Sequence, residues 1–172
     1  MVFSSANPRI VFVVDLGCDC VRVLVFDAVK GSLSHLSSFT APSGSGPRHL
    51  ASHPALPMLY LVNELNNTVI VYHYEESTHT AHVKQTISTL PSAAAGPSWC
   101  AAIILSSNGK NLYVSNRGHD SIAVFSVNDI GLLTLVEIVP VQGKCPRDIH
   151  IVGDWIVAAN QVRDDRWLPC PT

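Results

Sequence analysis

Residues 115–125 read SNRGHDSIAVF, a polar turn that leads into a short apolar strand. The same layout recurs at residues 14–26 (VDLGCDCVRVLVF) and 62–72 (VNELNNTVIVY), and residues 159–165 (ANQVRDD) begin in the same way. Each stretch has Asp or Asn at its second position, and the first three in chain order have it again four residues later. The second positions, at spacings of 48, 53 and 44 residues, are Asp15, Asn63, Asn116 and Asn160. A repeat of this length is typical of propeller blades and longer than most helical solenoid units.

Each repeat divides into four short segments of strand character, separated by clusters of Pro, Gly, Asn or Ser. In the clearest repeat these segments are residues 48–53, 58–63, 68–74 and 82–90. No stretch keeps an apolar period of about 3.6 residues, so we expect no helix longer than a turn. The predicted fold class is all-β, a β-propeller of about three and a half four-stranded blades, where closed propellers have about four to eight.

The repeat also sets the expected domain limits. Residues 1–5, MVFSS, supply only a stub before the first repeat, and the pattern stops after residue 161. We therefore expect a partial propeller over residues 1–161. Residues 162–172 show no alternation and have two prolines among the last four residues, so this tail is predicted to be irregular.

Composition excludes several classes of function. Charged residues make up 14% of the 172 residues, against a usual share of about 25%. The net charge of −2 gives no sign of a nucleic-acid-binding surface, and no apolar run approaches the roughly 18–20 residues of a membrane span. The five cysteines have neither disulfide-framework nor zinc-site spacing, and the N-terminus lacks a signal-peptide pattern. We expect a cytoplasmic protein without a metal site.

Positions that all repeats share are expected to serve the repeated structure. We interpret the Asx pairs as residues that shape the turn between the second and third strands of each blade. Other positions vary between repeats, and the residue after the first Asx is Leu16, Glu64, Arg117 or Gln161. The starts of the first strands also vary, with arginine in two of three: residues 47–49 (PRH), 97–99 (PSW) and 146–148 (PRD).

The varying positions point to a site. First strands line the channel of a propeller, so Arg48, Glu64, Arg117 and Arg147 are predicted to converge on one end of it, with Glu64 near at least one arginine. Guanidinium groups bind carboxylate or phosphate in a planar, bidentate way, and a carboxylate can move protons. The alternative is surface ion pairing between neighbouring blades. Two histidines, His49 and His119, lie beside the predicted site in the sequence.

These residues carry a resemblance. The chain resembles the lactonase family of seven-bladed propellers, which includes bacterial-type 6-phosphogluconolactonase and the carboxy-muconate cyclising isomerase of fungi. The resemblance rests on several motifs in order at blade spacing, over essentially residues 1–161. These are residues 46–49 (GPRH), 62–68 (VNELNNT), 115–118 (SNRG) with 120–125 (DSIAVF), 15–17 (DLG) with Asp19, and 146–148 (PRD) with 159–161 (ANQ).

The resemblance implies a seven-bladed propeller that hydrolyses or forms a lactone ring without metal or organic cofactor. It implies that Arg48 and Arg117 hold the anionic substrate and the oxygen that gains charge in the transition state, while Glu64 moves the proton. We expect His49 and Arg147 to take part in substrate binding. The expected ligand is a small anionic lactone or carboxylate, and the expected role is in carbohydrate metabolism, on the pentose phosphate route.

The departures from the family pattern lead to further expectations. The family site also uses a histidine in the first strand of the blade to which residues 1–5 belong, and this chain begins just after that position. About half of the family's blades are absent from the sequence, so we expect the chain to be incomplete or inactive by itself and to self-associate through exposed blade faces. A lactonising isomerase, a non-catalytic interaction module and a non-functional remnant stay open as alternatives, because a propeller fold does not determine function.

Overall fold

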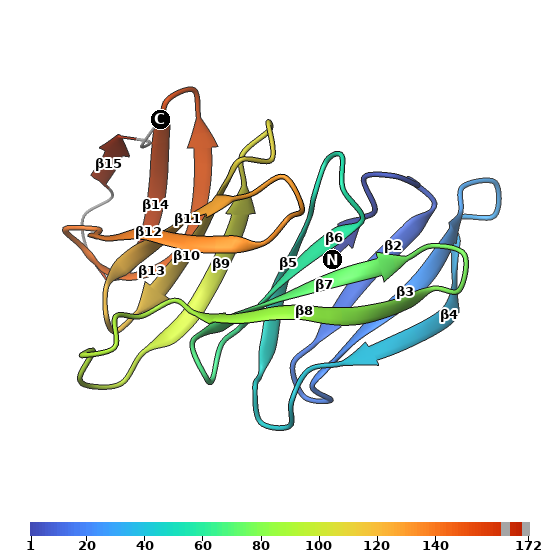
Figure 1. Cartoon of the computed structure of the whole chain (residues 1–172), viewed down its shortest axis with the longest axis horizontal. Coiled ribbons are helices and arrows are strands. Elements are labelled where there is room, and N and C mark those ends of the chain that lie inside the picture. The colour runs from blue at the N-terminus through green and yellow to red at the C-terminus, as the bar shows by residue number, and fades with distance from the viewer. Residues whose placement is uncertain (163–165, 170–172) are drawn as a thin grey trace.

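The structure, a computed structural model, describes residues 1–162 and 166–169 and consists of four antiparallel sheets (Figure 1). The first sheet, or first blade, is β1 (Val2–Phe3), β2 (Ile10–Asp15), β3 (Cys20–Asp27) and β4 (Ser32–Thr40). The second is β5 (Pro47–Ser52), β6 (Met58–Asn63), β7 (Thr68–Glu75) and β8 (Thr80–Ser88). The third is β9 (Trp99–Leu105), β10 (Asn111–Arg117), β11 (Ser121–Val127) and β12 (Leu133–Pro140). The fourth is β13 (Lys144–Val152), β14 (Trp155–Val162) and β15 (Arg166–Pro169).

Strands within each sheet are paired in chain order, so that every blade is a meander with its first strand innermost. The inner strands β5, β9 and β13 contact one another in sequence (Figure 1). The all-β propeller architecture predicted from the repeat is therefore confirmed. Among the described residues, no helix is long and apolar enough to cross a membrane.

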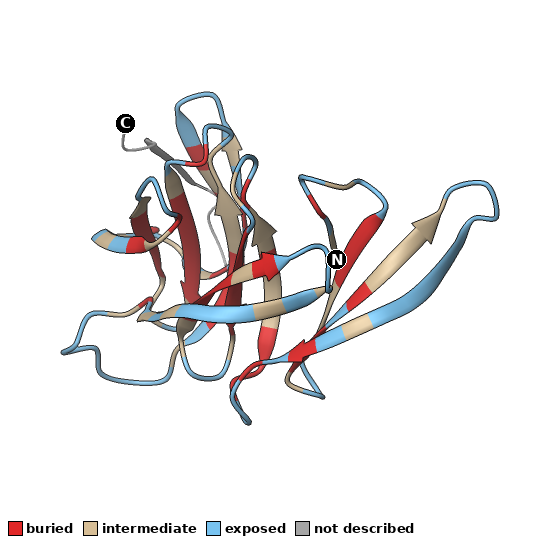
Figure 2. Cartoon of the chain, turned by 45° about the vertical axis from the view of Figure 1, so that its right-hand side comes forward, coloured by how far each residue is buried: buried red, intermediate tan, exposed pale blue. Residues whose placement is uncertain are grey.

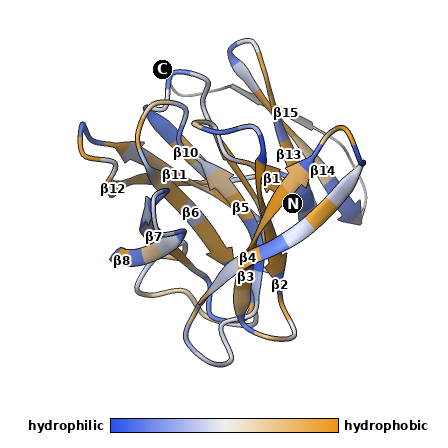
Figure 3. Cartoon of the chain, turned by 90° about the vertical axis from the view of Figure 1, so that its right-hand side faces the viewer, coloured by the Kyte–Doolittle hydropathy of each residue, from blue (hydrophilic) through white to orange (hydrophobic). Residues whose placement is uncertain are grey.

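Blades are held together by apolar layers between neighbouring sheets. Strand β6 is buried along its whole length because both of its faces are covered: Leu59 and Leu61 pack toward the first blade, Tyr60 and Val62 toward the third. This explains its unbroken apolar run, since alternate residues of a strand point to opposite faces. The outer strands β4 and β8 are mostly exposed and mixed in hydropathy (Figures 2 and 3).

The Asx pairs shape the turns between second and third strands, as predicted. The second member of each pair has a left-handed backbone, with φ of 48° at Asp19, 53° at Asn67 and 56° at Asp120. Asp and Asn tolerate this conformation better than most residues.

The side chains of these same residues also bind the chain where it approaches the next blade. Asp19 accepts hydrogen bonds from the backbone N–H groups of Gly44 and Gly46, both at 2.8 Å. The Asn67 amide donates to the Ser98 carbonyl at 2.8 Å. Asp120 accepts from the Cys145 N–H at 2.7 Å. We call these contacts the Asx clasps. Each one fixes the start of the following inner strand, from which site residues project.

The tail departs from expectation. Val162 is the last residue of β14, and residues 166–169 form β15, which pairs with β14 from Trp155 to Ala158. The prediction of an irregular tail is therefore wrong for these five residues. The outer edge of β14 offers free backbone groups, and an extended segment can pair with such an edge without an alternating pattern of its own. The remaining part of the tail after residue 162 lies outside the described residues.

Candidate active site

A β-bulge interrupts three inner strands at the same point. On β5, Arg48 is the extra residue between the pairs Pro47↔Asn63 and His49↔Val62. On β13, Arg147 is the extra residue between the pairs Pro146↔Asn160 and Asp148↔Ala159. Bulges re-aim side chains and are common beside active sites. The two arginines are therefore equivalent bulge residues of β5 and β13.

The bulge of the third blade corrects one sequence alignment. On β9 the register shifts beside Ala101, next to the pair Asn116↔Cys100, which corresponds to Asn63↔Pro47 in the second blade. The equivalent of Arg48 is thus Ala101, whereas the sequence comparison had placed Ser98 there. That comparison followed the prolines, but in the third blade the proline precedes the bulge by several residues. Consequently, a blade with alanine separates the two blades that carry arginine.

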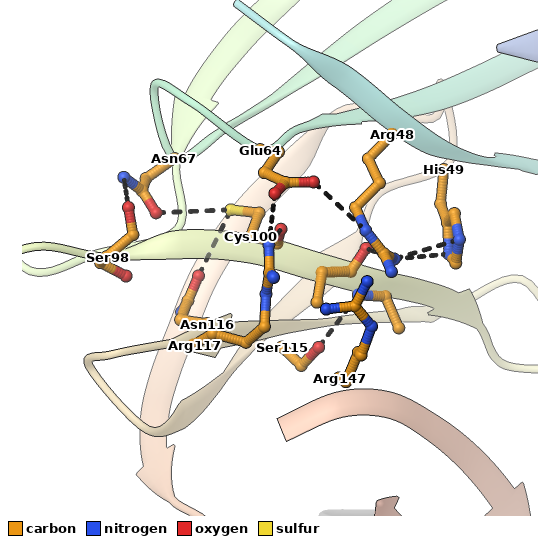
Figure 4. Close-up of polar contacts among 12 residues, drawn as sticks. Arg48, His49, Glu64, Asn67, Ser98, Cys100, Ser115, Asn116, Arg117 and Arg147 are labelled. Carbon is orange, nitrogen blue, oxygen red and sulfur yellow. Dashed lines mark hydrogen bonds and ion pairs between the residues drawn. The ribbon is translucent and has the colours of Figure 1, made fainter. Parts of the chain in front are cut away.

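Glu64 lies between two arginines (Figure 4). It follows β6 directly, and its carboxylate contacts Arg48 Nε at 3.3 Å and Arg117 Nη2 at 2.7 Å. The prediction that these three side chains meet, with Glu64 near at least one arginine, is confirmed. The side chains are only 17%, 20% and 12% exposed for Arg48, Glu64 and Arg117, so this is not the surface pairing of the alternative interpretation. Burying such a network costs desolvation energy that its own attraction does not reliably offset, which favours a functional reason for it.

Backbone carbonyls of the third blade hold both guanidinium groups. Arg48 Nη1 donates to the Ala101 carbonyl at 2.8 Å, and Arg117 Nη2 donates to the Cys100 carbonyl at 3.2 Å. Burial lowers the pKa of Arg48; the charges of Arg117 and Arg147 lower it further, while the stronger attraction of Glu64 opposes the shift. Like charges are thus gathered around one carboxylate, an arrangement suited to a bound anion.

His49 lies beside Arg48, and its Nε2 is 3.1 Å from Arg48 Nη1. Burial, and then the positive charge of Arg48, lower the pKa of His49. Its imidazole is therefore neutral at pH 7. The other histidine considered from sequence, His119, bonds Ser121 Oγ at 2.8 Å and does not line the cleft described next.

A cleft of about 480 Å³ opens between the second and fourth blades. It is lined by Arg48, His49, Arg147, Asp148, Ala159, Asn160 and Gln161. Arg147 contacts the Gln161 side chain at 3.5 Å, and no described carboxylate forms an ion pair with it. The structure thus brings Arg48, His49 and Arg147 to one cleft, with Glu64 and Arg117 reached through Arg48 (Figure 4). Within the described residues, no group of three or more His, Cys, Asp or Glu side chains could hold a metal ion.

Sequence reasoning missed a buried polar group behind Arg117. Thr89, Cys100 and Asn116 are each fully buried and lie within hydrogen-bond distance of one another. In the sequence analysis, Asn116 is treated only as a turn residue and Cys100 is assigned no role. Comparison of the blades could have identified this group, because Thr89 and Cys100 occupy the positions at which the second blade has Ala41 and Pro47.

Among relatives with known sequences, a protein of Lactococcus lactis subsp. cremoris is 41% identical over 158 residues. The 6-phosphogluconolactonase of Bacillus subtilis is 37% identical over 154 residues, which are 88% of this chain and 44% of that protein. The chain thus spans about half the length of these relatives.

Solved structures agree. A Lactobacillus plantarum protein superposes with a TM-score of 0.88 at 31% identity, over 98% of this chain and 52% of that one. The periplasmic gluconolactonase of Pseudomonas aeruginosa superposes with a TM-score of 0.83 at 27% identity, over 98% and 56%. The family model described as "Lactonase, 7-bladed beta-propeller" matches residues 1–166. With its propeller blades and this match, the chain belongs to the lactonase family of seven-bladed β-propellers.

Proposed function

We propose that Arg48, Glu64 and Arg117 form the reactive centre of a lactonase that opens a sugar-acid lactone, with 6-phosphogluconolactone as the first substrate to test. The observation that carries the proposal is the Glu64 carboxylate held between two part-buried guanidinium groups at the channel end. Support comes from the family and from a relative named 6-phosphogluconolactonase. We place the reaction in carbohydrate metabolism, on the pentose phosphate route.

The chemistry follows from the charges. Ionised Glu64 takes a proton from a water molecule, whose oxygen then bonds to the lactone carbonyl carbon. Negative charge develops on the carbonyl oxygen and is stabilised by the guanidinium groups of Arg117 and Arg48. When the ring C–O bond breaks, Glu64 returns its proton to the departing ring oxygen. The product is the open hydroxy acid, and Glu64 is ionised again.

The adjoining cleft supports an anionic substrate. Arg147 has no carboxylate partner among the described residues, and it stands across the cleft from Arg48 on the equivalent bulge. We assign to Arg147, with Arg48 and neutral His49, the binding of a phosphate or carboxylate group carried by the lactone. A lactonising isomerase of the carboxy-muconate type is the second candidate. It loses no water: a carboxylate oxygen adds to a carbon–carbon double bond of the substrate, and an acid, here Glu64, gives a proton to the other carbon.

The test is an assay of the 172-residue chain with 6-phosphogluconolactone, in which the release of acid measures hydrolysis. We expect a rate above that of the uncatalysed reaction. Glu64→Gln keeps the size of the side chain but removes the base, and we expect the rate to fall about 10²–10⁴-fold. An active Glu64→Gln variant would contradict the assigned role. A folded chain that is inactive on this lactone and on a muconolactone would sink the catalytic proposal for this chain and favour the interaction-module alternative.

A further inference from the structure

Arg117 is held at one corner of its guanidinium group. Its Nη2 donates both to Glu64 Oε1, at 2.7 Å, and to the Cys100 carbonyl, at 3.2 Å. Among the described residues, its buried Nε has no hydrogen-bond partner and no bond of Nη1 is seen. The orientation of the group therefore depends on where β9 places the Cys100 carbonyl and where β10 ends.

A polar cluster lies directly behind that carbonyl. It consists of Thr89, from the connection between β8 and β9, with Cys100 and Asn116, and all three residues are 0% exposed. Asn116 Oδ1 accepts from Thr89 Oγ1 at 2.8 Å and lies 3.4 Å from Cys100 Sγ. Asn116 Nδ2 donates to the Thr89 carbonyl at 3.0 Å and to Ser121 Oγ at 3.3 Å. Every hydrogen-bonding position of the Asn116 amide is thereby used.

The thiol belongs to this cluster as a donor. Cys100 Sγ lies 3.1 Å from Thr89 Oγ1, and burial raises the pKa of the Cys100 thiol to about 12. The thiol therefore keeps its proton at neutral pH and can donate it to one neighbouring oxygen, Asn116 Oδ1 or Thr89 Oγ1. A buried, fully bonded cluster of this kind rigidifies the backbone that carries it. Here that backbone includes the carbonyl that binds Arg117 (Figure 4).

Comparison of the blades shows that the fold does not require the cluster. Three residues donate their backbone N–H to the carbonyl of the second Asx of the preceding blade, and they are therefore equivalent: Ala41, Thr89 and Val141. Three residues pair with the first Asx of their own blade: Pro47, Cys100 and Pro146. Thus the second and fourth blades use alanine, valine and proline where the third blade uses threonine and cysteine.

The second blade shows the consequence. Asn63, the equivalent of Asn116, has a buried Oδ1 without a hydrogen-bond partner in the part of the chain that the structure describes. The polar cluster thus occurs in the blade whose strand β10 ends on Arg117. The equivalent positions next to the second and fourth blades have apolar residues, and those blades form the same strand pairing.

We propose that Thr89, Cys100 and Asn116 are positioning residues that fix the Arg117 guanidinium group against Glu64. They do not touch the cleft and act through the Cys100 carbonyl and the end of β10. The effect on the order of Arg117 stands on geometry alone, whereas any effect on catalysis rests on the proposed function.

The test uses three variants of the 172-residue chain. Thr89→Val removes the hydroxyl and copies the residue at the equivalent position before the fourth blade, and Thr89→Ser restores a hydroxyl. Ser98→Ala is the matched control, because it removes another buried hydroxyl of the same connection that has no bond to the cluster. The readout is the NMR signal of the Arg117 Nε–H group, assigned by its loss in Arg117→Lys.

We expect hydrogen exchange at this Nε–H to be about tenfold faster in Thr89→Val than in the wild type, because local opening becomes easier. Thr89→Ser and Ser98→Ala should exchange as the wild type does. If the wild type is active, kcat of Thr89→Val should fall about tenfold with KM within about twofold, since a misplaced group loses transition-state contacts more than ground-state binding.

Unchanged exchange in Thr89→Val would overturn the proposal, whatever the activity. An inactive wild type with faster exchange in Thr89→Val would instead count against the proposed function and support the positioning role. If Thr89→Val does not fold, Cys100→Ala, which removes only the thiol, decides by the same exchange criterion.

Discussion

Arg117 Nη2 lies 2.7 Å from Glu64 Oε1, so the third blade supplies the cation for a carboxylate that the second blade carries. The contact joins the ends of two strands that are 53 residues apart in the chain. If the guanidinium group of Arg117 stabilises an oxyanion, its planar shape matters as well as its charge. We therefore expect Arg117→Lys to lower kcat on the lactone by about 10²–10³-fold. The control is Arg22→Lys, which alters an exposed pair with Asp15 and should leave kcat unchanged; equal losses in both variants would contradict the assignment.

Removing the central carboxylate should also cost stability. Glu64→Ala leaves two part-buried guanidinium groups facing each other without a counter-charge, and we expect a loss of about 1–3 kcal/mol in the free energy of unfolding, below the figure for fully buried pairs. Arg22→Ala breaks the exposed pair with Asp15, leaves the turn residue in place, and should cost clearly less than Glu64→Ala. Urea titrations followed by tryptophan fluorescence measure both, and a Glu64→Ala chain as stable as Arg22→Ala would refute the expectation.

Arg147 should affect substrate binding more than chemistry. Arg147→Ala removes one side of the cleft but no group at the reacting carbonyl, so KM for a phosphorylated lactone should rise about tenfold while kcat stays within about twofold. The rate on an unphosphorylated lactone should not change. A fall in kcat for both lactones would show instead that Arg147 acts at the reacting atoms.

Stability should decrease in mild acid because of His53. This histidine is 7% exposed; its Nδ1 accepts from the N–H groups of Ala55 and Leu56, at 3.1 and 2.9 Å, and it also bonds the backbone of Gly109 in the third blade. Burial lowers its pKa. The unfolded chain therefore takes up a proton first, and stability that is complete above about pH 6.5 declines as the pH falls from there toward the folded-state pKa.

Thermal unfolding between pH 8 and pH 5 tests this dependence. His53→Gln should flatten the curve only in part, because the pKa of His49 is lowered too and contributes in the same direction. His82→Gln, on the exposed strand β8, serves as the control and should keep the full dependence. A His53→Gln curve parallel to that of the wild type would exclude the role of His53.

The outermost sheets should promote self-association of the 172-residue chain. Phe3 on β1 and Val152 and Trp155 on the fourth sheet are 47%, 48% and 48% exposed. Light scattering of the wild type should give a mass above that of the monomer, and Phe3→Ser with Trp155→Ser should lower it. Val29→Ser, in the turn between β3 and β4 and away from the sheet faces, should have no effect; a monomeric wild type would end this expectation.

Much of the site could be predicted because the repeat separates structural from special residues. Residues 58–63 coincide with β6, and Glu64 and Arg117 were identified because they follow matching Asx residues in neighbouring repeats. The bulges could not be predicted, since strand alternation resumes on either side of a bulge and nothing in the sequence marks the added residue. For that reason Arg48 was aligned with Ser98 rather than Ala101. Strand β15 was missed because its pairing depends on the free edge of β14.

The Asx clasps have a consequence for how the chain unfolds. In each clasp, an Asx side chain of one blade binds the backbone just before or at the start of the next blade's inner strand. The second, third and fourth blades are therefore each ordered in part by the blade before them. The free energy of unfolding of such an array is approximately the sum of the stabilities of the single blades and of the contacts between neighbouring blades. Unfolding therefore proceeds along the array from one blade junction to the next. Arg48 and Glu64, Arg117, and Arg147 come from three successive blades. The site is therefore lost as soon as either of the two junctions between them opens, before the blades themselves have melted.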